Sequence, residues 1–460
     1  GVQTCALPIY GSPTVVDAFA GGSWRTVLVG GLNKGGQGIY ALDVTNPNDF
    51  TVSAGNATKL SMWEFTDAND ADLGFTYSQP AVVKLPNGVW AAVFGNGYNN
   101  TFPDGRVSTT GTAAAYIVNL ATGALISKID LNTGLTADPT GGNRPNGLAT
   151  LAPVDVDGDF KVDFIYAGDL FGNLWRININ AGTSGALTTT STRIFSACGA
   201  NACSATNRQP ITTRPTVVRH PNGNGTMVFF GTGKYLETSD RLPKTGGLQS
   251  FYAIWDKVPT ETDATKALVS RSSLLRQEII VEQNFTFVEA GVSTTHPLRV
   301  TTNYKPDWNT HGGWYIDLLS PGMTGDSGER QVTNAVVRNN RVIFTTLIPT
   351  DDPCRAGGDS WLMEFDAVSG SRLQFSPFDL NNDGSFSTKD FVTIKVDGKD
   401  VSVPVSGRKL EGGAAATPSV MGAEGQNEFK YISTSGGVEV IKENPGTNDT
   451  DRQSWRQLGR

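Results

Sequence analysis

The sequence is short of charge and of histidine, and each shortage argues against a class of function. Charged residues make up 18% of the 460 residues, below the roughly 25% that is usual in soluble domains. The formal net charge is −7, so we expect no broad electrostatic surface for nucleic acid. The 3 histidines, His220, His296 and His311, lie too far apart to form an H-E-x-x-H zinc site.

Long apolar runs are also missing from the sequence. No stretch reaches the ~18 residues that a helix needs to cross a bilayer, so we expect no transmembrane segment. No charged region followed by an apolar core marks a signal peptide either. We interpret residues 1–9 (GVQTCALPI) as the translation of a sequencing adapter, which implies that the N-terminal region of the parent protein is missing. The alternative is a genuine terminal segment.

Glycine and apolar residues, in contrast, are plentiful. The chain has 53 glycines among its 460 residues, more than the usual ~7%. Hydrophobic residues make up 38% and aromatic residues 9%, which is enough for a core and argues against wholesale disorder. The composition is typical of an acidic, turn-rich, extracytoplasmic β protein.

The chain has 4 cysteines. Cys198 and Cys203 lie in the small-residue stretch SACGANACSA, which could close a short disulfide, whereas a zinc site would need a second pair. A disulfide would favour an oxidising compartment. Cys354 is left over: it is free, pairs with missing sequence, or pairs with Cys5 if that residue is genuine.

A module of three β segments recurs along the chain. Each copy begins with a short apolar segment, usually led by proline, continues with a segment that runs into glycine, and ends with an aromatic-apolar segment closed by Asp or Asn. The six copies begin at Pro13, Pro80, Pro153, Pro215, Asn334 and Pro418.

The spacing of the copies predicts an all-β fold of the β-propeller type. A four-stranded blade needs about 40 to 50 residues, so most intervals fit one blade with long loops. Segments rich in β-branched and aromatic residues and bounded by glycine, proline and asparagine argue against helices. Radial stacking would cover the apolar faces of the small sheets. The rival arrangement is an elongated array of sandwiches.

The longest interval contains an insertion at about residues 257–313. This insertion is long for a loop, so we expect an ordered decoration of a single domain that covers residues 10–460. Residues 270–280 (SRSSLLRQEII) predict one short helix within it.

The first of two acidic loops follows the third copy of the module. Asp155, Asp157, Asp159 and Asp163 alternate along the chain, and carboxylates brought together in this way repel each other without a cation. Ca²⁺ accepts six to eight oxygen ligands in a flexible geometry, so we predict a calcium site. Lys161 would contribute its main-chain carbonyl, with its side chain pointing away. The alternative is a solvated acidic turn.

The second acidic loop follows the twelve-position calcium pattern more fully. Gly384 permits the sharp turn that the wrapping backbone needs. With aspartate in place of glutamate at the last position, bidentate ligation is less certain, and the alternative is a plain Asn/Asp turn. The predicted ligands are Asp379, Asn381, Asp383, Ser385, Ser387 and Asp390.

These modules and loops together resemble the C-terminal domain of the PilC/PilY proteins of type IV pili. The resemblance extends from Tyr10 to Arg460 and includes the stretch YAGDLFGNLW that follows the first acidic loop. The other stretches that carry it are residues 11–16, 29–31, 38–44, 229–236, 313–318, 328–330, 352–354, 357–361 and 454–456.

The resemblance implies a modified seven-bladed β-propeller, displayed at the pilus tip or fimbrium, at the outer membrane, or in the periplasm in transit. Proteins of this family promote pilus biogenesis, oppose retraction, support twitching motility and attach to surfaces. The implied partners are the pilus machinery and minor pilins, with host or abiotic surfaces bound through the missing N-terminal region.

The resemblance also implies ligands. The family's calcium loop matches Asp155, Asp157, Asp159, Asp163 and the Lys161 carbonyl. A second loop in some members resembles residues 379–387, although Ser387 replaces an expected acid for which Asp390 would substitute.

Two other functions remain open from the sequence. A quinoprotein dehydrogenase would also be a calcium-containing propeller, and residues 366–370 (DAVSG) resemble its strand ends. Such enzymes use a vicinal cysteine pair, which this chain lacks, and no G-x-S-x-G nucleophile motif is present. We therefore expect no enzyme. The third reading is a propeller scaffold with structural calcium and no role in pili.

Overall fold

The structure is a computed structural model that describes residues 11–51, 53–243, 246–257, 268–322, 327–352, 357–423 and 427–446. Several sequence expectations fall outside the described residues. These are the terminal segment 1–9 with Cys5, residues 258–267 of the insertion, Cys354, and the stretch 454–456.

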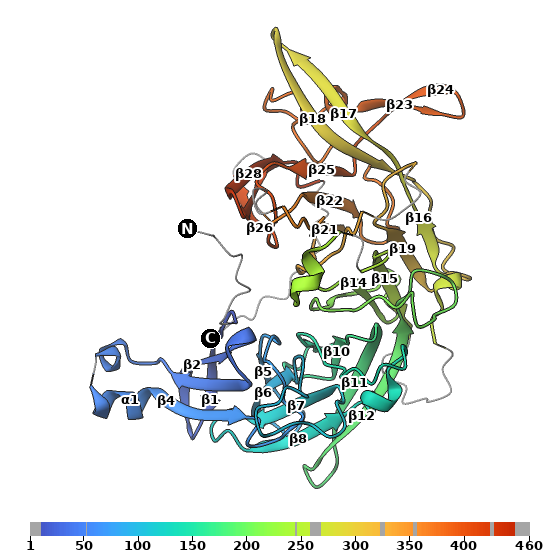
Figure 1. Cartoon of the computed structure of the whole chain (residues 1–460). Helices are drawn as coiled ribbons and strands as arrows, with labels where there is room; N and C mark the ends of the chain where they lie inside the picture. Colours follow the sequence, from blue (N-terminus) through green and yellow to red (C-terminus); the bar gives the residue numbers. More distant parts are fainter. Residues whose placement is uncertain are drawn as a thin grey trace. The chain divides into compact units, whose positions relative to one another are not determined.

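The regular secondary structure of the described residues is almost entirely β-strand, and the chain divides into two compact units (Figure 1). The first unit runs to Val217 and includes Val258–Leu268. The second unit comprises Val218–Lys257 and Val269–Arg460.

The first unit contains three four-stranded antiparallel sheets, each a meander whose strands follow chain order. This is the arrangement of a propeller blade. The first sheet has β1 (Thr14–Ala20), β2 (Ser23–Gly31), β3 (Gly38–Asp43) and β4 (Ser61–Thr66). The second has β5 (Ala81–Lys84), β6 (Trp90–Gly95), β7 (Ala114–Asn119) and β8 (Leu125–Asp130). The third has β9 (Ala152–Val154), β10 (Phe164–Gly168), β11 (Asn173–Ala181) and β12 (Leu187–Ser196).

Short helical segments lie in the connections. The one α-helix of the described residues is α1 (Ala54–Leu60), which begins where the Ser53 side chain accepts a hydrogen bond from the Asn56 amide. None of the described helices is long and apolar enough to cross a membrane. The 3₁₀ segments are η1 (Asn33–Gly35), η2 (Pro47–Phe50), η3 (Leu135–Ala137), η4 (Thr238–Arg241), η5 (Arg271–Ser273) and η6 (Thr388–Asp390).

The remaining sheets are more elaborate than simple meanders. A five-stranded sheet has the order β13-β14-β15-β19-β16, with β13 (Thr216–Arg219), β14 (Thr226–Gly231), β15 (Ser250–Asp256), β19 (Gly313–Asp317) and β16 (Leu275–Gln277). A six-stranded sheet has the order β17-β18-β25-β22-β21-β20, with β17 (Ile279–Glu289), β18 (Val292–Thr301), β25 (Gly407–Leu410), β22 (Ser360–Asp366), β21 (Arg341–Thr345) and β20 (Val336–Arg338). Two smaller sheets are the hairpin of β23 (Val392–Val396) and β24 (Lys399–Val403) and the three-stranded β26 (Ser419–Ala423), β27 (Asn427–Thr434) and β28 (Gly437–Glu443).

The sequence repeats predict the sheets correctly. Each of the six copies falls on three consecutive strands of one sheet, as in β1-β2-β3 and β26-β27-β28. The reason lies in the alternation of side chains along a strand. On β6, Val93 belongs to the core between the second and third sheets, while its neighbour Phe94 belongs to the core between the first and second. Both faces of this sheet are therefore buried against neighbouring sheets.

The second unit has aromatic and aliphatic cores of its own. The rings of Phe251 and Phe344 stack with centroids 4.1 Å apart and join the five- and six-stranded sheets. Another cluster joins the β17–β18 hairpin to the β23–β24 hairpin through residues such as Phe287, Leu380 and Val392.

The helix predicted for residues 270–280 is wrong. This segment forms η5, β16 and the start of β17. The Arg271 guanidinium is buried against the Asp317 carboxylate, and β16 pairs in parallel with β19. These tertiary bonds outweigh the helix propensity of the Leu-Leu-Arg-Gln run. The described part of the insertion is otherwise dominated by the β17–β18 hairpin.

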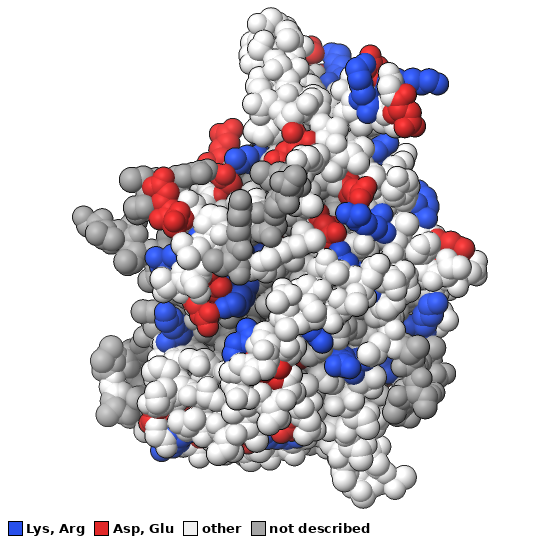
Figure 2. Space-filling view, turned by 45° about the vertical axis from the view of Figure 1, so that its right-hand side comes forward, with Lys and Arg blue, Asp and Glu red and all other residues white. Residues whose placement is uncertain are grey.

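Charged side chains of both signs are interspersed among uncharged ones on the face in view in Figure 2. This pattern agrees with the low charged fraction of 18%.

Candidate metal centres

The Asp155 loop connects β9 to β10, which are antiparallel neighbours in the third sheet. Its backbone takes positive φ at Gly158 (+82°) and at Phe160 (+65°). The strain at the non-glycine residue is compensated by a hydrogen bond, because the Phe160 amide donates to the Asp155 carboxylate at 2.8 Å. The loop is thus folded around the first of its acidic side chains.

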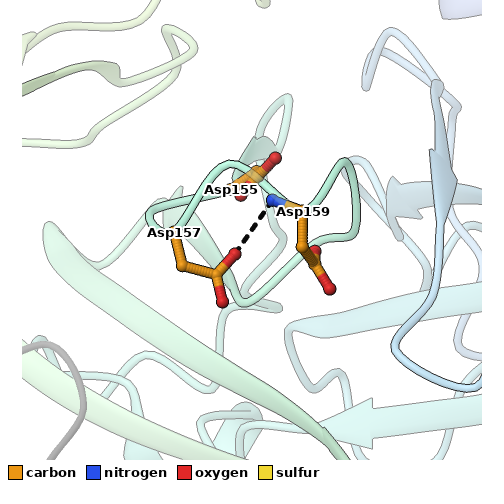
Figure 3. A group of neighbouring side chains, drawn as sticks. All are labelled: Asp155, Asp157 and Asp159. Atoms are coloured by element: carbon orange, nitrogen blue, oxygen red, sulfur yellow. Dashed lines mark hydrogen bonds between the residues drawn. The ribbon is translucent and has the colours of Figure 1, made fainter.

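Three carboxylates of this loop converge (Figure 3). Oxygens of Asp155, Asp157 and Asp159 all lie within 4.8 Å of one another. Asp155 also accepts the Gly158 amide at 2.7 Å, and Asp157 accepts the Asp159 amide at 3.0 Å. These backbone donors orient the carboxylates while leaving Asp157 and Asp159 exposed to solvent.

Lys161 and Asp163 occupy different surroundings from the three converging carboxylates. The Lys161 ammonium donates to Asp159 at 2.6 Å, so the expectation that this side chain points away is wrong: Asp159 is its nearest counter-charge. The same contact lowers the pKa of Asp159 and raises the pKa of Lys161. Asp163 accepts the Val156 amide at 2.8 Å. Burial, together with repulsion from Asp157 and Asp155, raises the pKa of Asp163.

This donor set fits calcium. Every side-chain ligand in the cluster is a carboxylate oxygen, and the four acids of the loop outnumber its single ammonium. Hard cations with many oxygen ligands suit such a site, whereas Zn²⁺ or copper would favour nitrogen or sulfur donors.

The Asp379 loop lies between β22 and β23 in the second unit. Its turn has positive φ at Asn382 (+57°) and Gly384 (+83°). The Gly384 amide donates to Asp379 Oδ2 at 3.0 Å, and the Asp383 amide donates to Asn381 Oδ1 at 3.2 Å. The loop therefore wraps its own side-chain oxygens, as a calcium loop of this pattern does.

One oxygen of this loop stands out. Asp379 is 9% exposed, and its Oδ1 is buried without a hydrogen-bond partner among the described residues. A buried carboxylate oxygen without a donor carries a large desolvation cost. A cation at this position would remove that cost, so the loop also fits calcium.

The other predicted ligands of this loop already have partners. Asp383 accepts from the Ser385 hydroxyl at 2.6 Å, and this bond, with that from the Ser385 amide, lowers the pKa of Asp383 to about 2. Asp390 accepts the amides of Leu380 and Ser387, both at close range (2.8 and 2.9 Å). Burial raises the pKa of Asp390, although these backbone donors oppose it.

Asp390 is therefore a closing residue of the loop. Together with Ser387 it forms a capping box at η6. The pattern Ser-x-x-Asp before the apolar Phe391 is the sequence signal that indicates this role.

Cys198 and Cys203 form a disulfide in the structure, with Cα atoms 5.4 Å apart. The bridge follows β12 and closes a short loop in the first unit.

Sequence reasoning missed Glu289, which ends β17 and reaches the Asp379 loop. Its carboxylate lies 3.1 Å from the Lys389 ammonium. The two residues are 100 positions apart, and no local pattern links them; only the pairing of the hairpin with the rest of the unit brings them together.

Stacked antiparallel meanders with oxygen-rich acidic loops define the class: a β-propeller domain with candidate cation sites. A family model described as the PilY1 beta-propeller domain matches residues 4–291. The chain belongs to the PilY1 family.

Similar proteins agree with this assignment. The chain is 34% identical to the type IV pilus biogenesis factor PilY1 of Pseudomonas aeruginosa, over 100% of this chain and 38% of that protein. It is 33% identical to a PilY1 homolog of Xylella fastidiosa, over 97% of this chain and 30% of that protein. The crystal structure of the P. aeruginosa PilY1 C-terminal domain matches with a TM-score of 0.75 and 30% identity, covering 95% of this chain and 84% of that one. The chain thus spans 38% and 30% of the lengths of these two curated relatives.

Proposed function

We propose that this chain is the calcium-binding β-propeller domain of a type IV pilus biogenesis factor, and that calcium at the Asp155 loop regulates pilus extension and retraction. The observation that carries the calcium site is the convergence of Asp155, Asp157 and Asp159 oxygens within 4.8 Å. The pilus role is supported by the names of the relatives, which are type IV pilus biogenesis factors. The Asp379 loop is the second calcium site of the proposal.

The proposed location is extracytoplasmic, at the pilus tip or outer membrane, or in the periplasm in transit. The disulfide between Cys198 and Cys203 supports an oxidising compartment. The proposed partners are the pilus machinery and minor pilins. Adhesion to host or abiotic surfaces would belong to the N-terminal part of the parent protein.

Calcium would act on the connection between β9 and β10. A bound ion shifts a conformational equilibrium only by its differential affinity for the two states. At a hundred times its dissociation constant, an ion that binds one state alone biases the equilibrium by about 2.7 kcal/mol. This is sufficient to turn a mostly mobile loop into a mostly docked one, and so to change a contact with the pilus machinery.

The proposed role is regulatory and includes no catalytic step. A quinoprotein dehydrogenase would instead bind a quinone cofactor. Reconstitution with the quinone, followed by its absorbance, tests this alternative directly; we expect no bound cofactor.

The decisive experiment is complementation of a deletion strain with the full-length parent protein carrying Asp155→Ala. We expect pili to assemble while twitching motility and the balance of extension and retraction change. Asp155 also accepts two loop amides, so Asp157→Asn is the gentler second variant, because asparagine retains the oxygen that accepts the Asp159 amide.

The matched control is Asp400→Asn. This exposed aspartate pairs with Lys395 outside both acidic loops, and its replacement should leave motility unchanged. Normal twitching and normal surface pili in both loop variants, with calcium binding shown to be lost, would contradict the proposed regulatory role.

A further inference from the structure

The tip of the β17–β18 hairpin is fixed against the Asp379 loop. Glu289 is the last residue of β17 and is followed by a tight turn at Ala290 and Gly291, both with positive φ. The Thr294 hydroxyl of β18 donates to the Leu380 carbonyl at 3.1 Å. Phe287 and Leu380 belong to one buried cluster, and Figure 1 shows the hairpin next to the β23–β24 element that follows the loop. The hairpin on either side of its turn is therefore held against Leu380, the second residue of the loop.

An ammonium group lies between two carboxylates at this contact. Lys389 is 3.1 Å from Glu289 Oε2 and 3.6 Å from Asp383 Oδ2. The Asn381 side-chain amide also lies 3.4 Å from Glu289 Oε2 and 3.0 Å from Asp383 Oδ2. Residues from two distant segments thus surround one positive charge.

The loop needs one more acid than its own sequence provides. The twelve-position calcium pattern ends in a glutamate that binds the ion with both oxygens. Here Asp390 takes that position with a side chain one methylene shorter, and it is fully buried with both oxygens accepting backbone amides at the loop's own closure, so it is poorly placed to bind an ion with both oxygens. The buried Oδ1 of Asp379, without a donor among the described residues, shows that the loop has an oxygen that its own donors do not satisfy.

We propose that Glu289 supplies the missing acidic ligand, so that one calcium ion is bound jointly by the Asp379 loop and the tip of the β17–β18 hairpin. This inference rests on the proposed calcium binding at the Asp379 loop. The ion takes the place of the Lys389 ammonium between Glu289 and Asp383, and Lys389 moves to solvent, where its side chain is already 59% exposed. Calcium then cross-links two segments that the sequence separates by about 90 residues.

Calcium titration calorimetry of the whole chain tests this arrangement. An Asp155→Ala background removes the first ligand of the Asp155 loop, so that the second loop alone is measured. In this background, Glu289→Gln should weaken calcium binding by about tenfold or more, since affinity at such sites follows the number of charged ligands. Glu278→Gln is the matched control: this exposed glutamate pairs with Arg276, and its replacement should leave the affinity unchanged.

A second variant should change the calcium affinity in the opposite direction. Lys389→Met removes the competing ammonium and should strengthen calcium binding severalfold. Hydrogen exchange adds an independent readout, because calcium should slow exchange at residues 288–292 in the background protein and not in its Glu289→Gln variant. Circular dichroism of each variant verifies that it is folded.

The outcomes separate this inference from the proposed function. If Asp379→Asn abolishes calcium binding in the background while Glu289→Gln leaves it unchanged, the loop site stands and the role of Glu289 is overturned. If the background protein binds no calcium, both the Asp379 loop site and the role of Glu289 as its ligand are overturned, while the proposal for the Asp155 loop is unaffected.

Discussion

The Asp155 loop and the Asp379 loop carry the same alternation of oxygen-bearing side chains, yet their surroundings differ. In the first loop Asp157 and Asp159 are exposed, and Asp155 is only partly buried. In the second loop Asp379 is 9% exposed, and a hairpin from another segment contacts the loop at Leu380. The spacing of the acids is therefore not sufficient to define what a cation would do.

The difference lies in what already holds each loop together. The Asp155 loop is held mainly by short-range bonds from its own amides. The Asp379 loop is closed by Asp390 and docked against β18 through Thr294. We infer that calcium would order the first loop and would cross-link segments around the second.

The largest expected effect is on local exchange. Amide exchange at Gly158 and Phe160 requires the loop to open, and the open loop does not bind the ion. At a calcium concentration of a hundred times the dissociation constant, exchange at these amides should therefore slow by up to about hundredfold. The amides of Leu380 and Ser387 should change much less, since the Asp390 carboxylate that accepts them is fully buried, whereas Asp155 is partly exposed. Hydrogen exchange with mass spectrometry measures both loops in one experiment. Equal protection of the two loops would contradict the comparison.

A smaller effect is expected from the lysine of the first loop. Lys161→Met should tighten calcium binding there by about fivefold, since a nearby ammonium opposes a cation by roughly 1 kcal/mol at an exposed site. The main-chain carbonyl at this position is retained. Lys161→Arg keeps the charge and serves as the control. Calorimetry that finds weaker binding in Lys161→Met would show that the side chain helps to build the site.

The smallest expected effect is on the stability contributed by the ion pair between Lys128 and Asp72, which calcium should not influence. Burial would raise the pKa of Asp72, but hydrogen bonds from Lys128 at 2.6 Å and from Ser108 outweigh it and lower this pKa. A lowered pKa contributes stability that is present above the ordinary value near 3.8 and is lost as pH falls through the lowered value.

Lys128→Met should therefore lower the free energy of unfolding by about 1 kcal/mol at pH 7, after allowance for solvent screening of the partly exposed Lys128–Asp72 pair. The difference from the parent chain should narrow as pH falls below about 4. Urea unfolding at both pH values measures this, with and without calcium. A difference that depends on calcium would mean that the ion acts on the whole first unit and not only on the loop.

Much of the fold could be predicted from the sequence, because blade strands leave a local signal. Val93 and Phe94 show why: alternate residues of one strand are buried on opposite faces, which produces the continuous apolar segments of the repeats. Residues 270–280 were predicted incorrectly because their structure depends on β19 and on Asp317, neither of which is local.

In the candidate sites, too, the features set by local sequence could be predicted and those set by tertiary contacts could not. The oxygens of Asp155, Asp157 and Asp159 converge because close spacing and a tight turn bring them together. The orientation of Lys161 and the approach of Glu289 depend on charge and packing in three dimensions. The capping role of Asp390 could have been inferred from the Ser-x-x-Asp pattern.

The most direct test of the account is the calcium stoichiometry of the whole chain, measured by calorimetry together with Asp155→Ala and Asp379→Ala. We expect two ions per chain, with one lost in each variant and both lost in the double variant. A chain that binds no calcium, or whose binding is unchanged by Asp155→Ala, would contradict the proposal that the Asp155 loop is a calcium site.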